Sequence, residues 1–203
     1  MFTHVDAERA SAAARASDLL RASGVVRSPL EGLPVSVKDL FDVAGEVTTA
    51  GSKVLQDAPP AARSAPVIER LIGAGAVIVG RTNMTEFAFS GLGLNPHYGT
   101  PKNPWDRLGG GRIPGGSSSG AAVSVTDGMA ALAIGSDTGG SVRIPSALCG
   151  LTGFKPTQRR VPTEGALPLS TSLDSIGPLG ASVRCCALVD AVLAGEPLQP
   201  PSP

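Results

Sequence analysis

The sequence has few aromatic residues and almost no histidine. Of 203 residues, 3% are Phe, Trp or Tyr and two are His. Most of the 42% hydrophobic content is therefore Ala, Val, Ile and Leu. This composition favours a buried α/β sheet over an aromatic-rich β-sandwich.

The sequence also lacks an excess of either charge. Lys and Arg together number 17, as do Asp and Glu, so no overall field argues for nucleic acid or an anionic membrane as a partner. No apolar run approaches the roughly 18 residues that a membrane-spanning helix needs. Asp6, Glu8 and Asp18 argue against a secretory or transit peptide at the start. We expect a cytoplasmic protein with no membrane partner and no direct contact with nucleic acid.

Cysteine and histidine show no metal-binding spacing. Cys149, Cys185 and Cys186 contain no C-x-x-C pair, and His4 and His97 lie far apart in sequence. We therefore expect no metal and no other cofactor. An odd number of thiols, two of them adjacent, also fits a reducing compartment better than a disulfide scaffold.

What the sequence does have is two clusters of small residues, 115–120 and 135–141, with Lys38 upstream. Small residues before Ser141 let the backbone approach a substrate carbonyl and direct N–H groups at a developing oxyanion. The candidate donors are the N–H groups of Thr138, Gly139, Gly140 and Ser141. A serine nucleophile needs a base, usually histidine, lysine or an N-terminal amine. Lys38 is the base that the sequence offers, and the pattern predicts an acyl-transfer site.

Other serine and glycine motifs fit less well. The 115–120 cluster is not a phosphate-binding loop, because Ala121-Ala122 stands where lysine and serine or threonine would be needed. Ser141 does not fit the G-x-S-x-G pattern, because Arg143 replaces the last glycine. A Ser-His-Asp triad would have to use His97, and this remains an alternative.

The order of expected elements indicates a βαβ-like arrangement. Apolar spacing and turn residues predict helices over about 7–22, after a capping-box-like start at 3–6, and over 65–73, 120–125 and 182–193. They predict strands over 33–37, 76–80 and 130–134. Alternation of strands and helices favours a parallel arrangement with connecting helices. Lys38 then lies at the end of a strand.

Five segments together resemble the amidase signature family: 32–39, 80–87, 114–120, 135–145 and 153–157. In that family a neutral lysine accepts a proton from a serine on a cis peptide, which accepts one from the nucleophile. The resemblance gives these roles to Lys38, Ser117 and Ser141, since the interval of 24 residues between the serines is the family's usual spacing. It makes Ser118, Asp137 and Arg143 supporting residues. It also places Asn83, Met84, Glu86 and Phe87 in or near the pocket without a chemical role.

The resemblance implies an α/β fold with a mixed, largely parallel central sheet covered by helices on both faces, of which this chain holds the N-terminal part. We expect residues 1–195 to form a partial amidase signature domain. Residues 196–203 would be a proline-rich, linker-like tail leading to a missing C-terminal half. A homodimer is one assembly open to the full-length form.

The expected activity is hydrolysis of a small-molecule carboxylic amide through an acyl-Ser141 intermediate. One alternative is the glutaminase subunit of a tRNA-dependent amidotransferase. That subunit usually has a Tyr-Gly-Arg-Val-Ser run, whereas this chain has Gln-Arg-Arg-Val-Pro over 158–162, which favours a stand-alone hydrolase. The other alternative is an inactive, truncated remnant.

Overall fold

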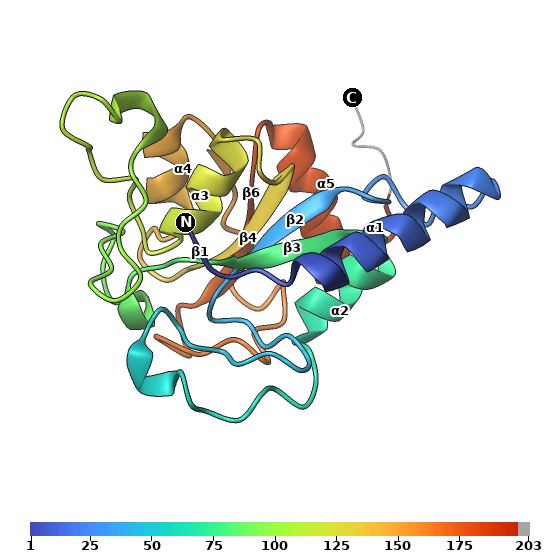
Figure 1. Ribbon diagram of the computed structural model, residues 1–203, viewed down its shortest axis with the longest axis horizontal. Helices are drawn as coiled ribbons and strands as arrows, with labels where there is room; N and C mark the ends of the chain where they lie inside the picture. The colour runs from blue at the N-terminus through green and yellow to red at the C-terminus, as the bar shows by residue number, and fades with distance from the viewer. Residues whose placement is uncertain (199–203) are drawn as a thin grey trace.

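The computed structural model describes residues 1–198, so most of the expected tail, 199–203, lies outside the described residues. Figure 1 shows a central sheet between helices. The strands are β1 (Phe2–His4), β2 (Pro34–Lys38), β3 (Val77–Thr82), β4 (Leu132–Asp137), β5 (Thr152–Gly153) and β6 (Ser175–Gly180). The α-helices are α1 (Ala7–Ala22), α2 (Pro66–Gly73), α3 (Ser119–Thr126), α4 (Arg143–Cys149) and α5 (Val183–Ala194). Short 3-10 turns cover Lys53–Leu55, Glu86–Ala88 and Pro104–Asp106.

The six strands form one mixed sheet in the order β1-β3-β2-β4-β6-β5. Strand β2 pairs in parallel with both β3 and β4. The outer pairs β1·β3, β4·β6 and β5·β6 are antiparallel. The expected mixed α/β sheet is confirmed, with its parallel pairing in the three central strands. Because β2 is central, Lys38 at its carboxyl end has a strand on each side.

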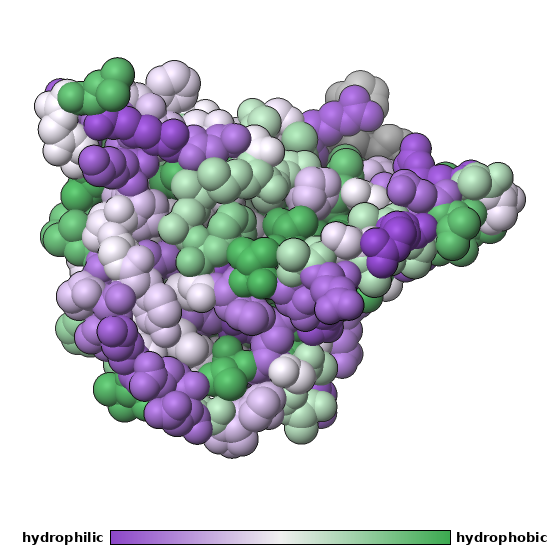
Figure 2. Space-filling model, in the orientation of Figure 1, coloured by the Kyte–Doolittle hydropathy of each residue, from purple (hydrophilic) through white to green (hydrophobic). Residues whose placement is uncertain are grey.

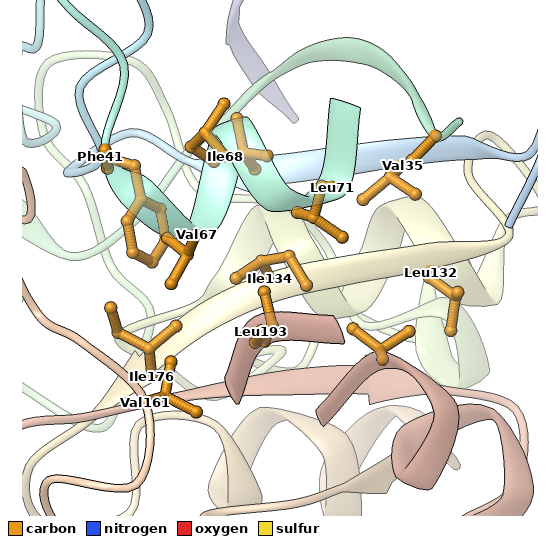
Figure 3. Close-up of a cluster of buried hydrophobic side chains, with 14 of the residues drawn as sticks. Val35, Phe41, Val67, Ile68, Leu71, Leu132, Ile134, Val161, Ile176 and Leu193 are labelled. Atoms are coloured by element: carbon orange, nitrogen blue, oxygen red, sulfur yellow. The ribbon is translucent and has the colours of Figure 1, made fainter. Parts of the chain in front are cut away.

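Two apolar cores lie on opposite faces of the sheet. Ile134 of β4 joins the larger core, with Val67 of α2 and Leu193 of α5 (Figure 3). The next residue back, Ala133, joins the smaller core with Val123 of α3. Successive strand side chains point to opposite faces, so the alternation in β4 gives each layer of helices its own core. Helices therefore cover both faces, as expected.

The N-terminal helix α1 covers the expected stretch, but the residues before it form a strand and not a capping box. Residues 2–4 form β1, which pairs with β3 through Phe2 and Thr82. Asp6 is the N-cap, and its carboxylate accepts the N–H of Arg9 at 2.9 Å. The capping pattern expected at Thr3 was wrong, because residues 2–4 pair with a sheet edge and Asp6 caps the helix instead. In Figure 1 helix α1 projects from the body, and Figure 2 shows hydrophobic side chains at its far end.

Four of the helices and strands were absent from the sequence-based expectations: β1, α4, β5 and β6. Strand β6 has the sequence Ser-Ile-Gly-Pro-Leu-Gly and is buried throughout. Proline is unfavourable inside a sheet and glycine weakens a strand, so the local sequence resembles a loop. In residues 1–198 no helix combines the length and apolar character needed to cross a membrane.

Candidate active site

Lys38 lies fully buried at the end of β2, with 0% of its surface exposed. Its Nζ is 2.7 Å from Ser117 Oγ and 2.8 Å from Ser136 Oγ. A longer contact of 3.4 Å reaches the Ser136 carbonyl oxygen. A neutral amine has two N–H donors and one lone pair. The two oxygens of Ser136 can accept both donors, which leaves the lone pair for the Ser117 hydroxyl.

Burial lowers the pKa of the Lys38 amine to about 7, because a charged ammonium loses its hydration inside the protein. The carboxylates of Asp137 and Asp174 act in the opposite direction and raise it. A lysine of this pKa is partly neutral at neutral pH, which a general base requires.

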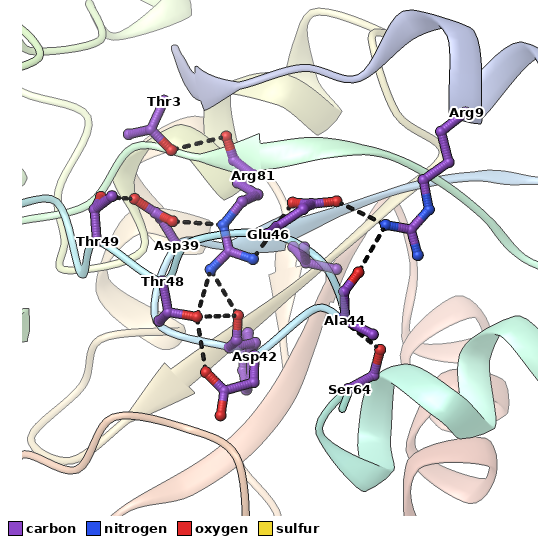
Figure 4. A network of polar contacts seen from close by, with 12 residues as sticks. Thr3, Arg9, Asp39, Asp42, Ala44, Glu46, Thr48, Thr49, Ser64 and Arg81 are labelled. Atoms are coloured by element: carbon purple, nitrogen blue, oxygen red, sulfur yellow. Dashed lines mark hydrogen bonds and ion pairs between the residues drawn. The ribbon is translucent and has the colours of Figure 1, made fainter. Parts of the chain in front are cut away.

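The carboxylate nearest in sequence to Lys38 is turned to another partner. Asp39 Oδ1 accepts Arg81 Nε at 2.6 Å, and both side chains are 1% exposed. Figure 4 shows this pair in a network that also includes Thr48 and Glu46. The guanidinium also donates to the Phe41 carbonyl oxygen at 2.6 Å. Arg81 therefore balances the charge of Asp39 and holds the chain that follows Lys38.

Ser117 is fully buried, and the Gly116–Ser117 peptide is cis. The N–H of Thr85 donates to the Ser117 carbonyl oxygen at 3.1 Å. A Cβ on Gly116 would come within 2.6 Å of the Gly93 backbone nitrogen, so only glycine fits before this serine. These contacts fix the Ser117 hydroxyl against Lys38.

Ser141 lies beside the same segment, because the N–H of Ser118 donates to the Ser141 carbonyl oxygen at 3.2 Å. Ser141 is 7% exposed, unlike the fully buried Ser117. Its hydroxyl makes no hydrogen bond with any residue of 1–198, Ser117 included. The expected supporting residue Ser118 thus joins the two loops through its backbone, and its hydroxyl contacts the Ser136 carbonyl oxygen at 3.4 Å.

Asp137 holds the second half of the loop that carries Ser141. Its carboxylate accepts the N–H of Gly140 at 2.8 Å and that of Val142 at 3.1 Å. Arg143 contacts the same carboxylate through Nε and Nη2, both at 3.0 Å. Burial would raise the pKa of Asp137, but the hydrogen bonds from Arg143 and the backbone outweigh it and the pKa is lowered. The Gly140 N–H is thus engaged, whereas those of Thr138, Gly139 and Ser141 have no acceptor among residues 1–198.

Ser136 and Asp174 were missed by the sequence reasoning. The signal for Ser136 was its place in the 135–141 cluster, directly after the strand expected over 130–134. Asp174 had no local signal: its contact with Thr138 spans 36 residues and depends on β6.

His97 lies in a different cluster from Lys38 and Ser117. Its Nε2 is 2.9 Å from Glu86 Oε1, which also accepts the Ser52 hydroxyl at 2.6 Å. Among residues 1–198, His97 makes no contact with Ser141, so the geometry does not favour a histidine triad. Within the same residues no three His, Cys, Asp or Glu side chains gather as a metal site would require.

Residues of the segment 80–87 hold the backbone next to the serine cluster. The backbone carbonyl oxygen of Asn83 accepts the Gly120 N–H at 2.8 Å and the Ser119 hydroxyl at 3.2 Å. Met84 is fully buried, and Phe87 has a left-handed backbone with φ of 50°. Asn83 thereby anchors the start of α3, at the end of the 115–120 cluster.

Comparisons with known proteins agree with this fold and motif set. The family profile described as Amidase matches residues 1–201. AtzE, the 1-carboxybiuret hydrolase subunit from Pseudomonas sp. (strain ADP), is 47% identical over 200 residues, covering 98% of this chain and 43% of that protein. The A subunit of glutamyl-tRNA(Gln) amidotransferase from Anaeromyxobacter sp. (strain K) is 49% identical over 195 residues, covering 96% of this chain and 39% of that protein.

Solved structures share the fold. A crystal structure of an amidase superposes with a TM-score of 0.89 at 45% identity, covering 98% of this chain and 45% of that one. Native peptide amidase from Stenotrophomonas maltophilia gives 0.85 at 36% identity, covering 97% and 40%. The fold is thus that of amidase-signature enzymes, and the chain belongs to the Amidase family. It spans about two-fifths of the length of the curated relatives it matches.

Proposed function

We propose that the protein hydrolyses a small-molecule carboxylic amide through an acyl-Ser141 intermediate, with Lys38 as base and Ser117 as proton relay. The observation that supports this most directly is the fully buried Lys38 amine, 2.7 Å from the Ser117 hydroxyl. Burial away from water disfavours the charged form of a lysine side chain. A neutral amine beside a hydroxyl can accept the proton of that hydroxyl.

In the proposed reaction, neutral Lys38 takes the proton of Ser117 while Ser117 takes that of Ser141. The Ser141 oxygen attacks the amide carbon, and the carbonyl oxygen becomes an oxyanion. The tetrahedral intermediate then expels the amine, which leaves with a proton returned through Ser117 from Lys38. Water attacks acyl-Ser141 by the same proton path, releasing the carboxylic acid and restoring all three residues.

We assign oxyanion stabilisation to the N–H groups of Thr138, Gly139 and Ser141, because the Gly140 N–H already donates to Asp137. Gly139 is the exposed residue of this loop, and a Cβ there would meet nothing within 4 Å. Removing one such donor typically costs about 2.7–4 kcal/mol of transition-state stabilisation. Asp137 and Arg143 would act as supporting residues by holding the far side of the loop.

The glutaminase subunit of a tRNA-dependent amidotransferase is the second candidate, favoured by the 49% identity to an amidotransferase subunit. Arg160 lies in the 158–162 run, where this chain departs from the sequence usual in that subunit. Its guanidinium forms ion pairs with Asp190 at 2.8 Å and Glu196 at 2.7 Å, which is a structural role. Release of ammonia from glutamine that depends on an added partner protein would support the amidotransferase. Hydrolysis of simple amides by the protein alone, as a monomer or homodimer, would support the amidase. Three free thiols favour the cytoplasm for either.

The nucleophile can be tested by labelling the complete protein, including any sequence that follows Pro203, with a fluorophosphonate. We expect Ser141→Ala to abolish both labelling and amide hydrolysis, and the exposed control Ser172→Ala to change neither. Persistent labelling of the Ser141→Ala protein at Ser117 would overturn the assignment of roles.

The base can be tested by the pH dependence of kcat/KM. Lys38 must be neutral to act, so the rate should rise as pH increases through about 7, the pKa of its amine. Lys38→Ala should lose about 10²-fold or more near pH 7 and less at alkaline pH, where hydroxide partly replaces the base. His97→Ala should keep the parent profile, and its complete loss of activity would move the site to a histidine triad.

A further inference from the structure

Asp174 joins two segments that meet at the nucleophile loop. Its Oδ1 accepts the hydroxyl of Thr138, the first loop residue after β4. Its Oδ2 accepts the N–H groups of Leu169 at 2.9 Å and Ser170 at 3.0 Å. One half-buried carboxylate therefore fastens the 169–174 turn and Thr138 to the start of β6.

This contact complements the one made by Asp137. Asp137 holds the N–H groups of Gly140, Val142 and Arg143, which form the second half of the loop. None of these bonds reaches Thr138 or Gly139. Within residues 1–198 the bond to Asp174 is the hydrogen bond made by the Thr138 side chain, so the first half of the loop depends on it.

Asp174 also lies near the base. Together with Ser136, which contacts Lys38, it lines a small cavity between Leu40 and the segment 163–171. The charged groups that act on Lys38 are Asp137 and Asp174. The negative charge of Asp137 is balanced by an ion pair with Arg143, and that of Asp39 by an ion pair with Arg81. Asp174 forms no ion pair with any side chain of residues 1–198, so its negative charge is the uncompensated one beside the amine.

We propose that Asp174 is a positioning residue for amide hydrolysis, which holds the Thr138 N–H in place for the oxyanion and maintains a negative charge beside Lys38. This inference rests on the function proposed above. It assigns Asp174 no contact with substrate; the residue acts through Thr138 and through the field at Lys38.

The two actions have separable kinetic consequences. A displaced donor weakens oxyanion stabilisation, so Asp174→Asn should lower the plateau value of kcat by roughly tenfold, less than the 10²–10³ of a donor removed outright, while KM changes little. Loss of the negative charge lowers the pKa of Lys38, since that carboxylate raises it. The acid limb of the kcat/KM profile should therefore move to lower pH.

Matched variants separate positioning from folding. Thr138→Val removes the hydroxyl but keeps the side-chain shape and the charge of Asp174. It should therefore lower kcat without moving the acid limb of the kcat/KM profile. Thr138→Ser, which keeps a hydroxyl, should have the kcat of the parent protein. The control is Glu164→Gln, a carboxylate of the same segment that is 74% exposed; it should match the parent. Each variant is compared in the complete protein, at equal thermal stability or at a temperature where all remain folded.

The outcomes distinguish this inference from the proposed function. If Ser141→Ala keeps its activity, the proposed function is wrong and Asp174 has no reaction to serve. If Ser141→Ala is inactive but Asp174→Asn keeps the parent kcat and acid limb, only the role of Asp174 is refuted. Equal losses in kcat and stability with an unmoved acid limb would reduce Asp174 to a structural residue and overturn the proposal.

Discussion

At the scale of single residues, Arg159 has a strained backbone conformation that glycine would adopt without strain. Its φ is 71°, in the left-handed region, where a residue with a Cβ is disfavoured by about 1–2 kcal/mol. Glycine avoids this but costs about 0.5–1 kcal/mol in unfolded-chain entropy. We expect Arg159→Gly to stabilise the protein by about 1 kcal/mol or less in urea unfolding. Arg159→Ala, which keeps a Cβ, should give no gain; an equal gain would attribute the effect to the lost charge.

The same scale shows what the sequence could predict of the site. The sequence singled out Lys38 as the available base and, through the resemblance, Ser117 as the relay; the Lys38 Nζ lies 2.7 Å from the Ser117 Oγ. The sequence could not reveal that the Gly140 N–H donates to Asp137, because a glycine-rich run does not specify where each N–H points. Nor could it reveal the contact of Asp174, which depends on strand β6 lying beside β4.

At the scale of elements, α2 owes its place to one buried face. Leu71 is fully buried in the larger core, whereas its neighbour Ile72 is 39% exposed. Leu71→Ala should cost about 2–5 kcal/mol of unfolding free energy, through lost burial and the cavity left behind. Ile72→Ala, on the same helix, should cost much less, and urea unfolding of both variants measures the difference. Similar losses at both positions would mean that helix propensity, and not packing, dominates.

Elements with a clear apolar period were predictable, and those made by long-range pairing were not. The helices at 65–73, 120–125 and 182–193 correspond to α2, α3 and α5 within one or two residues. Strand β4 extends three residues beyond the expected 130–134, to Asp137. Its extension is set by pairing with β6, whose Gly177 and Pro178 give no strand signal. Tertiary pairing therefore decided the part of the sheet that carries Asp137.

At the scale of the whole molecule, residues 1–198 leave apolar surface uncovered. Leu19 and Val26 near the end of α1 are 73% and 57% exposed. A largely apolar cleft lies between β5 and α5, where Phe154 and Val183 are 41% and 75% exposed. Large exposed apolar patches mark interaction surfaces or aggregation risks.

We therefore expect residues 1–203, expressed alone, to be unstable or inactive although the proposed catalytic residues are all present. The proposed oxyanion loop must be held to within about 0.5 Å, and this segment spans only about two-fifths of the length of its curated relatives. Urea unfolding, dye binding to apolar surface and an amidase assay on the purified segment provide the measurement. A cooperative unfolding transition together with amide turnover would show that the segment folds and is active by itself.

The burial of Lys38 also determines how fast its amine reacts with reagents in solution. Among Lys38, Lys53, Lys102 and Lys155, only the Lys38 amine is completely enclosed. Its lowered pKa makes it chemically ready for reductive methylation near neutral pH, yet no reagent can reach it in the closed protein. We expect mass spectrometry to find Lys38 methylated last. Its rate of modification then measures how often the structure around Lys38 opens locally.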